Sequence, residues 1–322
     1  MKKTVLLLLL LMATIAIEAG TRPKVALVLG GGGAKGAAEI GVLKYIEKSQ
    51  IPIDYIVGTS IGSIIGGLYS TGYRSAQLDS LFCSQDWLSL LTGRDISESR
   101  TIFSHDSTGT HVLGFPVGRR KNKKRKWGMM YGDSITSKFK TLTKIHDSID
   151  FNDLQTPFKC IAVDMTTFKE VVLDKGDLPL CMRASMSIPF LYKPVEIDSM
   201  QLVDGGLLNN LPVDVARKMG ADYVIAIDLT QNQHEEKETD FHYTDSNIGK
   251  LISWSLSRPD LKKYHQNVKD ADIYIHPDLK GCKPSDFKPK KIEYMIKQGE
   301  YAGRKAMADL KKLKTKIQKK QK

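Results

Sequence analysis

Two short apolar runs near the start of the chain each end in a glycine-rich turn, and a helical pattern follows each turn. The first run covers residues 24–30 and its turn ends at Gly36, and the second covers residues 54–58 and its turn ends at Gly62. Strand, turn and helix in this order are typical of βαβ units, which build a mainly parallel sheet. The sequence therefore predicts an α/β fold in which helices cover both faces of a mainly parallel central sheet.

The alternation continues along the chain and is interrupted twice by polar segments. Further strands are expected at residues 158–164, 170–173, 202–204, 222–228 and 272–276. Helices are expected at residues 34–48, 61–72, 134–145, 178–186, 213–219 and 292–314. The interruptions are a long excursion at about 95–130 and a shorter polar stretch at 230–246.

The second turn reads Gly58-Thr-Ser-Ile-Gly62, a G-x-S-x-G pattern. In a sharp strand-to-helix turn of this kind the serine hydroxyl is exposed and ready to act as a nucleophile. Gly58 and Gly62 avoid clashes where strand and helix cross, and the positive end of the following helix lies at Ser60. So short a pattern also arises by chance, but the strand and helix that it requires are both expected here.

The first turn allows two interpretations. The backbone N–H groups of Gly31, Gly32 and Gly33 are suited to stabilise the oxyanion of a tetrahedral intermediate. The spacing of Gly31, Gly33 and Gly36 also matches the dinucleotide-binding fingerprint. That fingerprint requires an acidic residue at the end of the second strand, whereas Asp54 precedes the core of that strand. The oxyanion interpretation is favoured, and nucleotide binding stays open as the alternative.

A nucleophilic serine needs a base within hydrogen-bonding distance. None of the seven histidines lies in a glycine-marked turn at the end of a strand. Asp204 ends an apolar run and is followed by Gly205 and Gly206, an arrangement that presents a carboxylate at the edge of a sheet. An Asp-Gly pair alone is more typical of a hairpin turn. Beside a serine turn, however, Asp204 becomes the favoured base, with Gly205 and Gly206 supporting its loop.

Residues 1–19 have the features of a secretory signal. Lys2 and Lys3 precede an apolar run at residues 5–17, and Ala19 is a plausible cleavage residue. The run is short for a membrane span, which needs about 20 apolar residues. We expect export to the periplasm, the outer membrane or the medium, with an uncleaved anchor as the alternative. The four cysteines are widely spaced, without metal-ligand spacing, and are expected to be unpaired core thiols.

The chain carries a formal net charge of +12, concentrated in two clusters. One lies at residues 311–322, and the other lies in the excursion and includes Arg119, Arg120, Lys121, Lys123 and Lys124. Basic clusters attract anionic surfaces such as phospholipid membranes or nucleic acids. Because export makes nucleic acid an unsuitable partner, an anionic membrane surface is the favoured one. A merely solvated loop and helix end explain the charge equally well.

Three motifs appear in an order that identifies a family. They are Gly31-Gly-Gly-Ala-Lys-Gly36, Gly58-Thr-Ser-Ile-Gly62 and Asp204-Gly-Gly206, and together they resemble the patatin-like phospholipases. Two further segments, Ala184-Ser-Met-Ser-Ile-Pro189 and Asn210-Leu-Pro212, also resemble parts of that family. The resemblance runs from about residue 23 to residue 228.

The resemblance implies a patatin-like three-layer sandwich and a Ser–Asp dyad without a catalytic histidine. In such a dyad Asp204 accepts the proton of Ser60 during attack on an ester and later activates water. It also implies a phospholipid or lysophospholipid substrate, and neither a metal nor a cofactor. Residues 20–230 then form the catalytic domain, and residues 231–322 form its C-terminal part, which ends in a basic helix.

Three hypotheses follow from the sequence. The leading one is an exported lipid acyl hydrolase of the phospholipase A or lysophospholipase type. The second is a nucleotide-binding protein that uses the first glycine turn. The third is a membrane-binding scaffold in which the dyad is vestigial. The sequence predicts neither the oligomeric state nor the acyl position that is cleaved.

Overall fold

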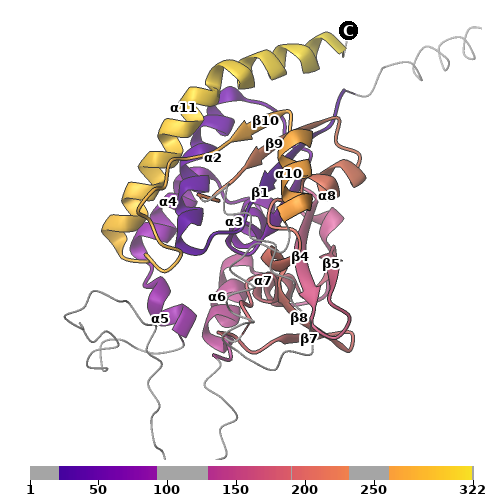
Figure 1. Cartoon of the computed structure of the whole chain (residues 1–322), viewed down its shortest axis with the longest axis vertical. Helices are drawn as coiled ribbons and strands as arrows, with labels where there is room; N and C mark the ends of the chain where they lie inside the picture. Colours follow the sequence, from indigo (N-terminus) through magenta and orange to yellow (C-terminus); the bar gives the residue numbers. More distant parts are fainter. Residues whose placement is uncertain (1–21, 93–129, 190, 232–260, 321–322) are drawn as a thin grey trace, which may run out of the picture.

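The computed structural model describes residues 22–92, 130–189, 191–231 and 261–320 (Figure 1). The expected signal at residues 1–19, the basic residues 119–124 and all but the first two residues of the polar stretch at 230–246 lie outside the described residues. All four cysteines lie within them and are unpaired. Among the described residues, no helix is both long enough and apolar enough to cross a membrane.

Within the described residues the main sheet has eight strands, which include all seven predicted ones and the unpredicted β7. They are β1 (Val25–Leu29), β2 (Tyr55–Thr59), β4 (Phe158–Asp164), β5 (Lys169–Leu173), β7 (Val195–Ile197), β8 (Met200–Asp204), β9 (Tyr223–Ile227) and β10 (Ile273–Ile275). Strands β10, β9, β1, β2 and β4 run parallel to one another in that order, and β5, β8 and β7 add antiparallel pairs. A separate pair joins β3 (Ile149–Asp150) and β6 (Lys175–Gly176).

The helices surround this sheet. They are α2 (Ala37–Ser49), α3 (Ile61–Ser70), α4 (Ser75–Ser84), α5 (Trp87–Thr92), α6 (Asp133–Thr143), α7 (Leu178–Ser185), α8 (Val213–Lys218), α10 (Leu261–Asp270) and α11 (Pro289–Lys320). Short 3₁₀ turns follow β1 and β8, namely η1 (Gly33–Gly36) and η4 (Gly205–Leu207), and η3 (Phe151–Asp153) follows β3. Helices α4, α5 and α10 were not predicted, because α5 has only six residues and few buried apolar residues mark α4 and α10.

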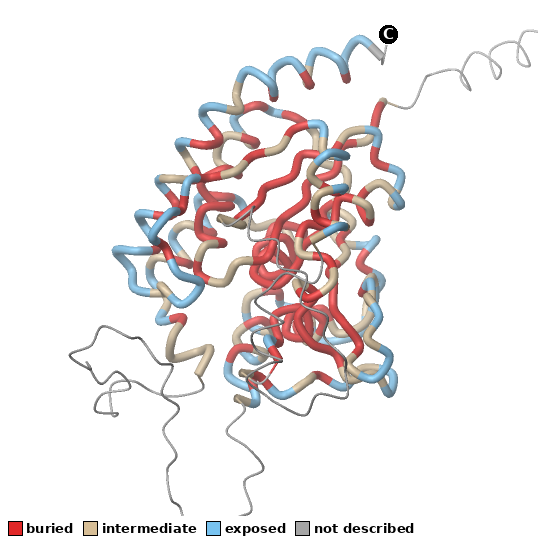
Figure 2. Tube along the Cα trace, in the orientation of Figure 1, coloured by how far each residue is buried: buried red, intermediate tan, exposed pale blue. Residues whose placement is uncertain are grey.

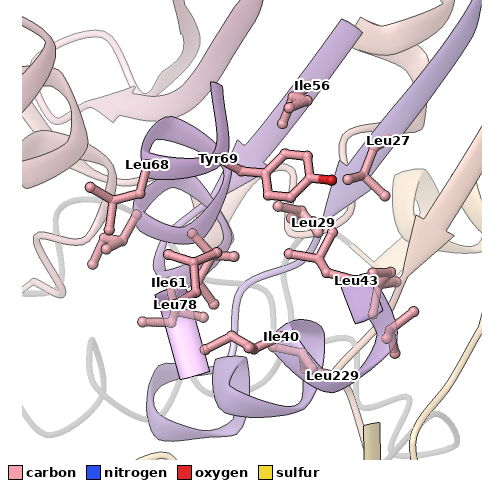
Figure 3. Packing of buried hydrophobic residues seen from close by; sticks show 14 of the residues in the cluster. Leu27, Leu29, Ile40, Leu43, Ile56, Ile61, Leu68, Tyr69, Leu78 and Leu229 are labelled. Carbon is pink, nitrogen blue, oxygen red and sulfur yellow. The ribbon is translucent and has the colours of Figure 1, made fainter. Parts of the chain in front are cut away.

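The two faces of the sheet carry two separate cores, as the alternation of side chains along β1 shows. Val25, Leu27 and Leu29 point into the larger core with residues of α2, α3 and α11, and Figure 3 shows Leu27 and Leu29 in this packing. Ala26 and Val28 point into the smaller core with residues of α8 and α10. In Figure 2 the buried strands lie between exposed helices. The predicted α/β sandwich with helices on both faces is therefore confirmed.

Strand β4 pairs with three strands, and two of them share one of its edges. Strand β5 occupies one edge along residues 160–164. On the other edge β2 pairs with residues 158–161 in parallel, and β8 pairs with residues 162–164 in antiparallel. Since β2 and β8 run toward each other along this edge, their carboxyl ends meet head to head. Thr59 at the end of β2 is opposite Ile161, and Asp204 at the end of β8 is opposite Ala162.

A two-residue turn sets the register of β8. Asp198 and Ser199 join β7 to β8, and both have positive φ angles, 49° and 64°. Positive φ at both central residues is typical of a type I′ turn, whose twist matches that of an antiparallel hairpin. The turn therefore fixes the register of β8 against β7.

Helix α11 packs unusually close to α2 through two glycines. A Cβ atom on Gly299 would lie 1.8 Å from the carbonyl oxygen of Ala38, and one on Gly41 would lie 2.0 Å from that of Ile296. The helix has 32 residues and extends beyond the predicted range at both ends. Figure 1 shows it along one side of the molecule, next to α2 and α4.

We expect Gly299→Ala to lower the free energy of unfolding by about 1–3 kcal/mol, because the new methyl group forces the two helices apart. The sign of this change in free energy is informative, because alanine in a free helix is about 1 kcal/mol more favourable than glycine and would by itself stabilise the protein. Urea unfolding measures the change, with Lys297→Ala on the exposed face of α11 as the control. A Gly299→Ala protein as stable as the parent would contradict the close packing.

Candidate active site

Ser60 occupies a strained turn between β2 and α3. Its φ and ψ angles are 56° and −121°, outside the regions that most residues adopt. A Cβ on Gly58 would lie 2.3 Å from the carbonyl oxygen of Gly62, and a Cβ on Gly62 would lie 2.3 Å from that of Leu29. Both positions therefore require glycine, as the sequence predicts for a nucleophile turn. Backbone strain of this kind is found where a side chain must be held in one orientation.

The head-to-head strand ends bring Ser60 and Asp204 into contact. The Ser60 Oγ donates a hydrogen bond of 2.6 Å to Oδ2 of Asp204, although 144 positions separate the two residues. The other carboxylate oxygen, Oδ1, accepts a 2.8 Å bond from the N–H of Gly206. Gly205 lets the chain pass over β4, because a Cβ there would lie 2.3 Å from the carbonyl oxygen of Ile161. The predicted pair and its glycine loop are thus assembled at one point.

Burial sets the proton affinity of Asp204. Ser60 is 8% and Asp204 is 7% exposed, so water solvates the carboxylate poorly. This desolvation raises the pKa of Asp204 from its ordinary 3.8 to about 6, and the hydrogen bonds from Ser60 and Gly206 limit the rise. At neutral pH the carboxylate is therefore ionised, yet it is a stronger base than an exposed aspartate.

The glycine loop after β1 lies against Ser60, with one difference from the prediction. A Cβ on Gly31 would lie 3.2 Å from the Cβ of Ser60, so the loop passes directly beside the serine. The N–H of Gly31, however, donates a 3.1 Å bond to the carbonyl oxygen of Asn210 and is not available to an oxyanion. Within the described residues, the N–H groups of Gly32 and Gly33 donate no hydrogen bond. The predicted donor set is therefore reduced to these two.

Asp54 has a structural role at the opposite end of β2. Its carboxylate forms ion pairs with Arg22 at 2.7 Å and Lys24 at 3.1 Å, and it accepts a 2.9 Å bond from the N–H of Val25. Strand β2 ends at Thr59, without the acidic residue that a dinucleotide site needs there. The dinucleotide interpretation of the first glycine turn therefore lacks its second element.

Three of the seven histidines lie within the described residues. They are His146, His265 and His276. His276, at the end of β10, contacts the carbonyl oxygen of Thr230 and the side-chain amide of Gln231. The hydroxyl of Ser60 is bonded to Asp204 instead. Four further histidines lie outside the described residues.

Two serines that sequence reasoning did not assign support the pair from α7 and the turn after it. Ser185 Oγ accepts a 3.0 Å bond from the N–H of Ser60 and donates a 2.6 Å bond to the carbonyl oxygen of Ile161. The carbonyl oxygen of Ser187 accepts a 2.9 Å bond from the N–H of Asp204. Both serines lie in segment 184–189, whose resemblance to a family motif was the available signal.

Comparison with known proteins agrees with these motifs. The family model described as patatin-like phospholipase matches residues 27–217. Patatin-like phospholipase domain-containing protein 6 of Mus musculus is 32% identical over 237 residues, which make up 73% of this chain and 15% of that protein. Lysophospholipase NTE1 of Mycosarcoma maydis is 35% identical over 205 residues, which make up 64% of this chain and 10% of that protein. The chain thus spans a small part of the length of these relatives.

Solved structures give a more distant likeness. The crystal structure of VipD from Legionella pneumophila aligns with 90% of this chain and 67% of its own, with a TM-score of 0.43 and 11% sequence identity.

We expect Asp204→Asn to stabilise the protein at pH 8. The folded-state pKa of Asp204 exceeds its unfolded value, so folding favours the protonated form. The associated stabilisation is complete below about pH 4 and is lost as the pH rises through about 6. Asparagine stays neutral, so its advantage over aspartate should grow by up to about 3 kcal/mol between pH 4 and pH 8.

Thermal unfolding at a series of pH values measures this difference. Asp54→Asn is the matched control, for which we expect a change in stability of the opposite sign. Cationic neighbours lower the pKa of Asp54, so removal of this carboxylate should destabilise the protein at pH 8. An Asp204→Asn advantage that is the same at both ends of the pH range would show that the carboxyl is not desolvated.

Proposed function

This chain belongs to the patatin-like phospholipase family, and on that premise we propose that it is a lipid acyl hydrolase with a Ser60–Asp204 dyad. The substrates are phospholipids or lysophospholipids, whose fatty-acyl ester bonds it cleaves. The single observation that carries the proposal is the 2.6 Å hydrogen bond from Ser60 Oγ to Asp204 Oδ2. A serine hydroxyl bonded to a buried carboxylate of raised pKa is the pairing of nucleophile and base that acyl transfer requires.

In the first half of the proposed reaction, Ser60 Oγ attacks the carbonyl carbon of the ester and its proton moves to Asp204. The resulting tetrahedral intermediate carries a negative charge on the former carbonyl oxygen. When it collapses, the bond to the alcohol oxygen breaks, and Asp204 returns the proton to that oxygen. The alcohol leaves, and the fatty-acyl group stays as an ester on Ser60.

In the second half, Asp204 takes a proton from water, whose oxygen attacks the acyl carbon. The bond to Ser60 Oγ then breaks, Ser60 regains its proton and the fatty acid leaves. Asp204 must be ionised at the start of both halves. Because burial raises its pKa to about 6, the rate should fall as the pH drops through about 6.

The N–H groups of Gly32 and Gly33 are the proposed donors to the oxyanion. They belong to the loop whose Gly31 lies beside Ser60, and among the described residues they have no other acceptor. The amino-terminal end of α3 adds a positive partial charge next to Ser60. One such donor is typically worth about 3–4 kcal/mol of transition-state stabilisation.

The two alternatives have less support. Nucleotide binding lacks the acidic residue at the end of β2, since Asp54 is engaged at the other end. A vestigial dyad does not explain why a buried carboxylate is retained at a cost in stability and bonded directly to a strained serine. An intact pair of this kind is better explained by catalysis.

Loss of either dyad residue should abolish fatty-acid release. We expect Ser60→Ala and Asp204→Ala to lower kcat by roughly 10³-fold or more, because nucleophile and base act as a unit. Release from anionic phospholipid vesicles, with a metal chelator present, is the measurement. The matched control is Ser70→Ala at the far end of α3, another buried serine. Activity that survives Ser60→Ala would refute the proposal, and loss in Ser60→Ala alone would move the search for the base to the histidines.

We further propose that the protein is exported and acts at an anionic membrane surface. Support comes from the signal-like residues 1–19 and from the basic cluster of the excursion. Juxtamembrane basic residues contribute about 1 kcal/mol each to binding of anionic lipid.

Neutralising the cluster should therefore weaken membrane binding. The variant replaces Arg119, Arg120, Lys121, Lys123 and Lys124 with glutamine. Its affinity for vesicles that contain phosphatidylserine should fall at least tenfold at low salt, and its activity on a soluble ester should not change. Vesicles of phosphatidylcholine alone serve as the control. Equal sedimentation of both proteins with anionic vesicles would exclude a membrane-binding role for these residues.

A further inference from the structure

The segment Asn209–Asn210, two buried or half-buried residues after η4, contacts all three sequence motifs at once. The carbonyl oxygen of Asn209 accepts a 2.9 Å bond from Thr59 Oγ1, next to the nucleophile. The N–H of Asn209 donates a 2.9 Å bond to the carbonyl oxygen of Gly205, next to the base. The carbonyl oxygen of Asn210 accepts the 3.1 Å bond from Gly31 of the glycine loop.

Asn210 holds Gly31 at two points. Besides accepting from its N–H, Asn210 donates a 3.3 Å bond from Nδ2 to the carbonyl oxygen of Gly31. Its Oδ1 lies so close that a Cβ on Gly31 would come within 2.2 Å, and a Cβ on Gly206 within 2.8 Å. The side-chain amide is therefore wedged between the glycine loop and the loop of Asp204.

This contact has a consequence for Gly32. The carbonyl group of Gly31 and the N–H group of Gly32 belong to the same peptide plane and, in a trans peptide, point in opposite directions. The structure contains no cis peptide among the described residues. By bonding to the carbonyl oxygen of Gly31, Asn210 therefore fixes the direction in which the N–H of Gly32 points, on the side away from Asn210.

The segment that carries Asn210 is itself held in place. Asn209 Nδ2 donates a 2.8 Å bond to Asp214, and Asn209 Oδ1 accepts a 3.0 Å bond from Asn267 of α10. Asn267 Oδ1 also accepts a 3.0 Å bond from the N–H of Asp214. Their hydrogen bonds stabilise the segment and do not involve the glycine loop. A variant at one of these groups therefore tests the stability of the segment separately from the direct contact between Asn210 and Gly31.

We propose that Asn210 is a positioning residue for the reaction, one that orients the 31–32 peptide so that the N–H of Gly32 meets the developing oxyanion. The inference rests on the proposed function. Asn210 acts by holding the loop in advance, so its effect appears in the transition state and not in substrate binding.

The test replaces Asn210 with alanine and follows two reactions of Ser60. One is turnover of a soluble ester. The other is labelling by a fluorophosphonate, in which Ser60 Oγ bonds to phosphorus, fluoride leaves, the serine proton passes to Asp204 and charge develops on the phosphoryl oxygen. We expect kcat and the labelling rate constant to fall roughly 10- to 100-fold, because a misplaced group of this kind costs up to about 10²-fold. KM should stay within about threefold.

The pH profile separates positioning from general damage. Asp204 keeps its bonds to Ser60 and Gly206, so the acid limb of kcat/KM in Asn210→Ala should stay near the pH at which the parent loses activity. Asn267→Ala is the matched control, since it removes a buried amide of the same region that does not contact Gly31. We expect it to lower the Tm at least as much as Asn210→Ala but to leave both rates within about threefold. Asn210→Ser is used if the alanine variant fails to fold.

Several results would overturn the inference. These are rates within about threefold of the parent in Asn210→Ala, an equal loss of rate in Asn267→Ala, or a shift of the acid limb by about one pH unit. The same two measurements on the parent protein show whether the role of Asn210 alone is wrong or the proposed function as well. If the parent neither labels at Ser60 nor hydrolyses esters, the dyad itself is refuted, and the role of Asn210 falls with it.

Discussion

The rest of the structure depends on the way two strands share one edge of β4. Strand β2 follows this edge in parallel and β8 follows it in antiparallel, so their carboxyl ends face each other across neighbouring residues, Ile161 and Ala162. In a purely parallel sheet these ends would lie side by side on different strands. Here they meet in line, which places Ser60, the residue after β2, within hydrogen-bonding distance of Asp204, the last residue of β8. The glycines around the site allow the chain to leave the sheet twice in this confined space.

At Asp204 the same burial increases basicity and lowers the stability of the folded protein. The desolvation that makes Asp204 a better base also makes its charged form unfavourable in the folded protein. Two hydrogen bonds, from Ser60 and from the N–H of Gly206, recover part of that loss. The surrounding supports come from Ser185, Ser187 and the Asn209–Asn210 segment, which hold backbone groups and leave the carboxylate itself with few partners.

Local sequence predicted the helices and strands better than their arrangement in the sheet. Hydrophobic runs marked most strands, and the G-x-S-x-G pattern predicted the sharp turn at Ser60. Both signals depend on residues that are close together in the chain. The direction of β8 could not be predicted, since a strand's period does not reveal its partner. The N–H of Gly31 was expected to face an oxyanion, but its acceptor, the carbonyl oxygen of Asn210, lies 179 positions away. The role of Asn210 follows from the same distant contact.

The two-residue turn between β7 and β8 has a consequence for how this protein can change. Surface loops usually accept insertions without harm. This one sets the register of β8 against β7, because Asp198 and Ser199 form the turn between them, and the same β8 pairs with β4. One inserted residue that shifted β8 along its partners would move Asp204 by about 3.3 Å and turn its side chain to the other face of the sheet. The length of this surface hairpin is therefore constrained by the hydrogen bond that joins Ser60 to Asp204.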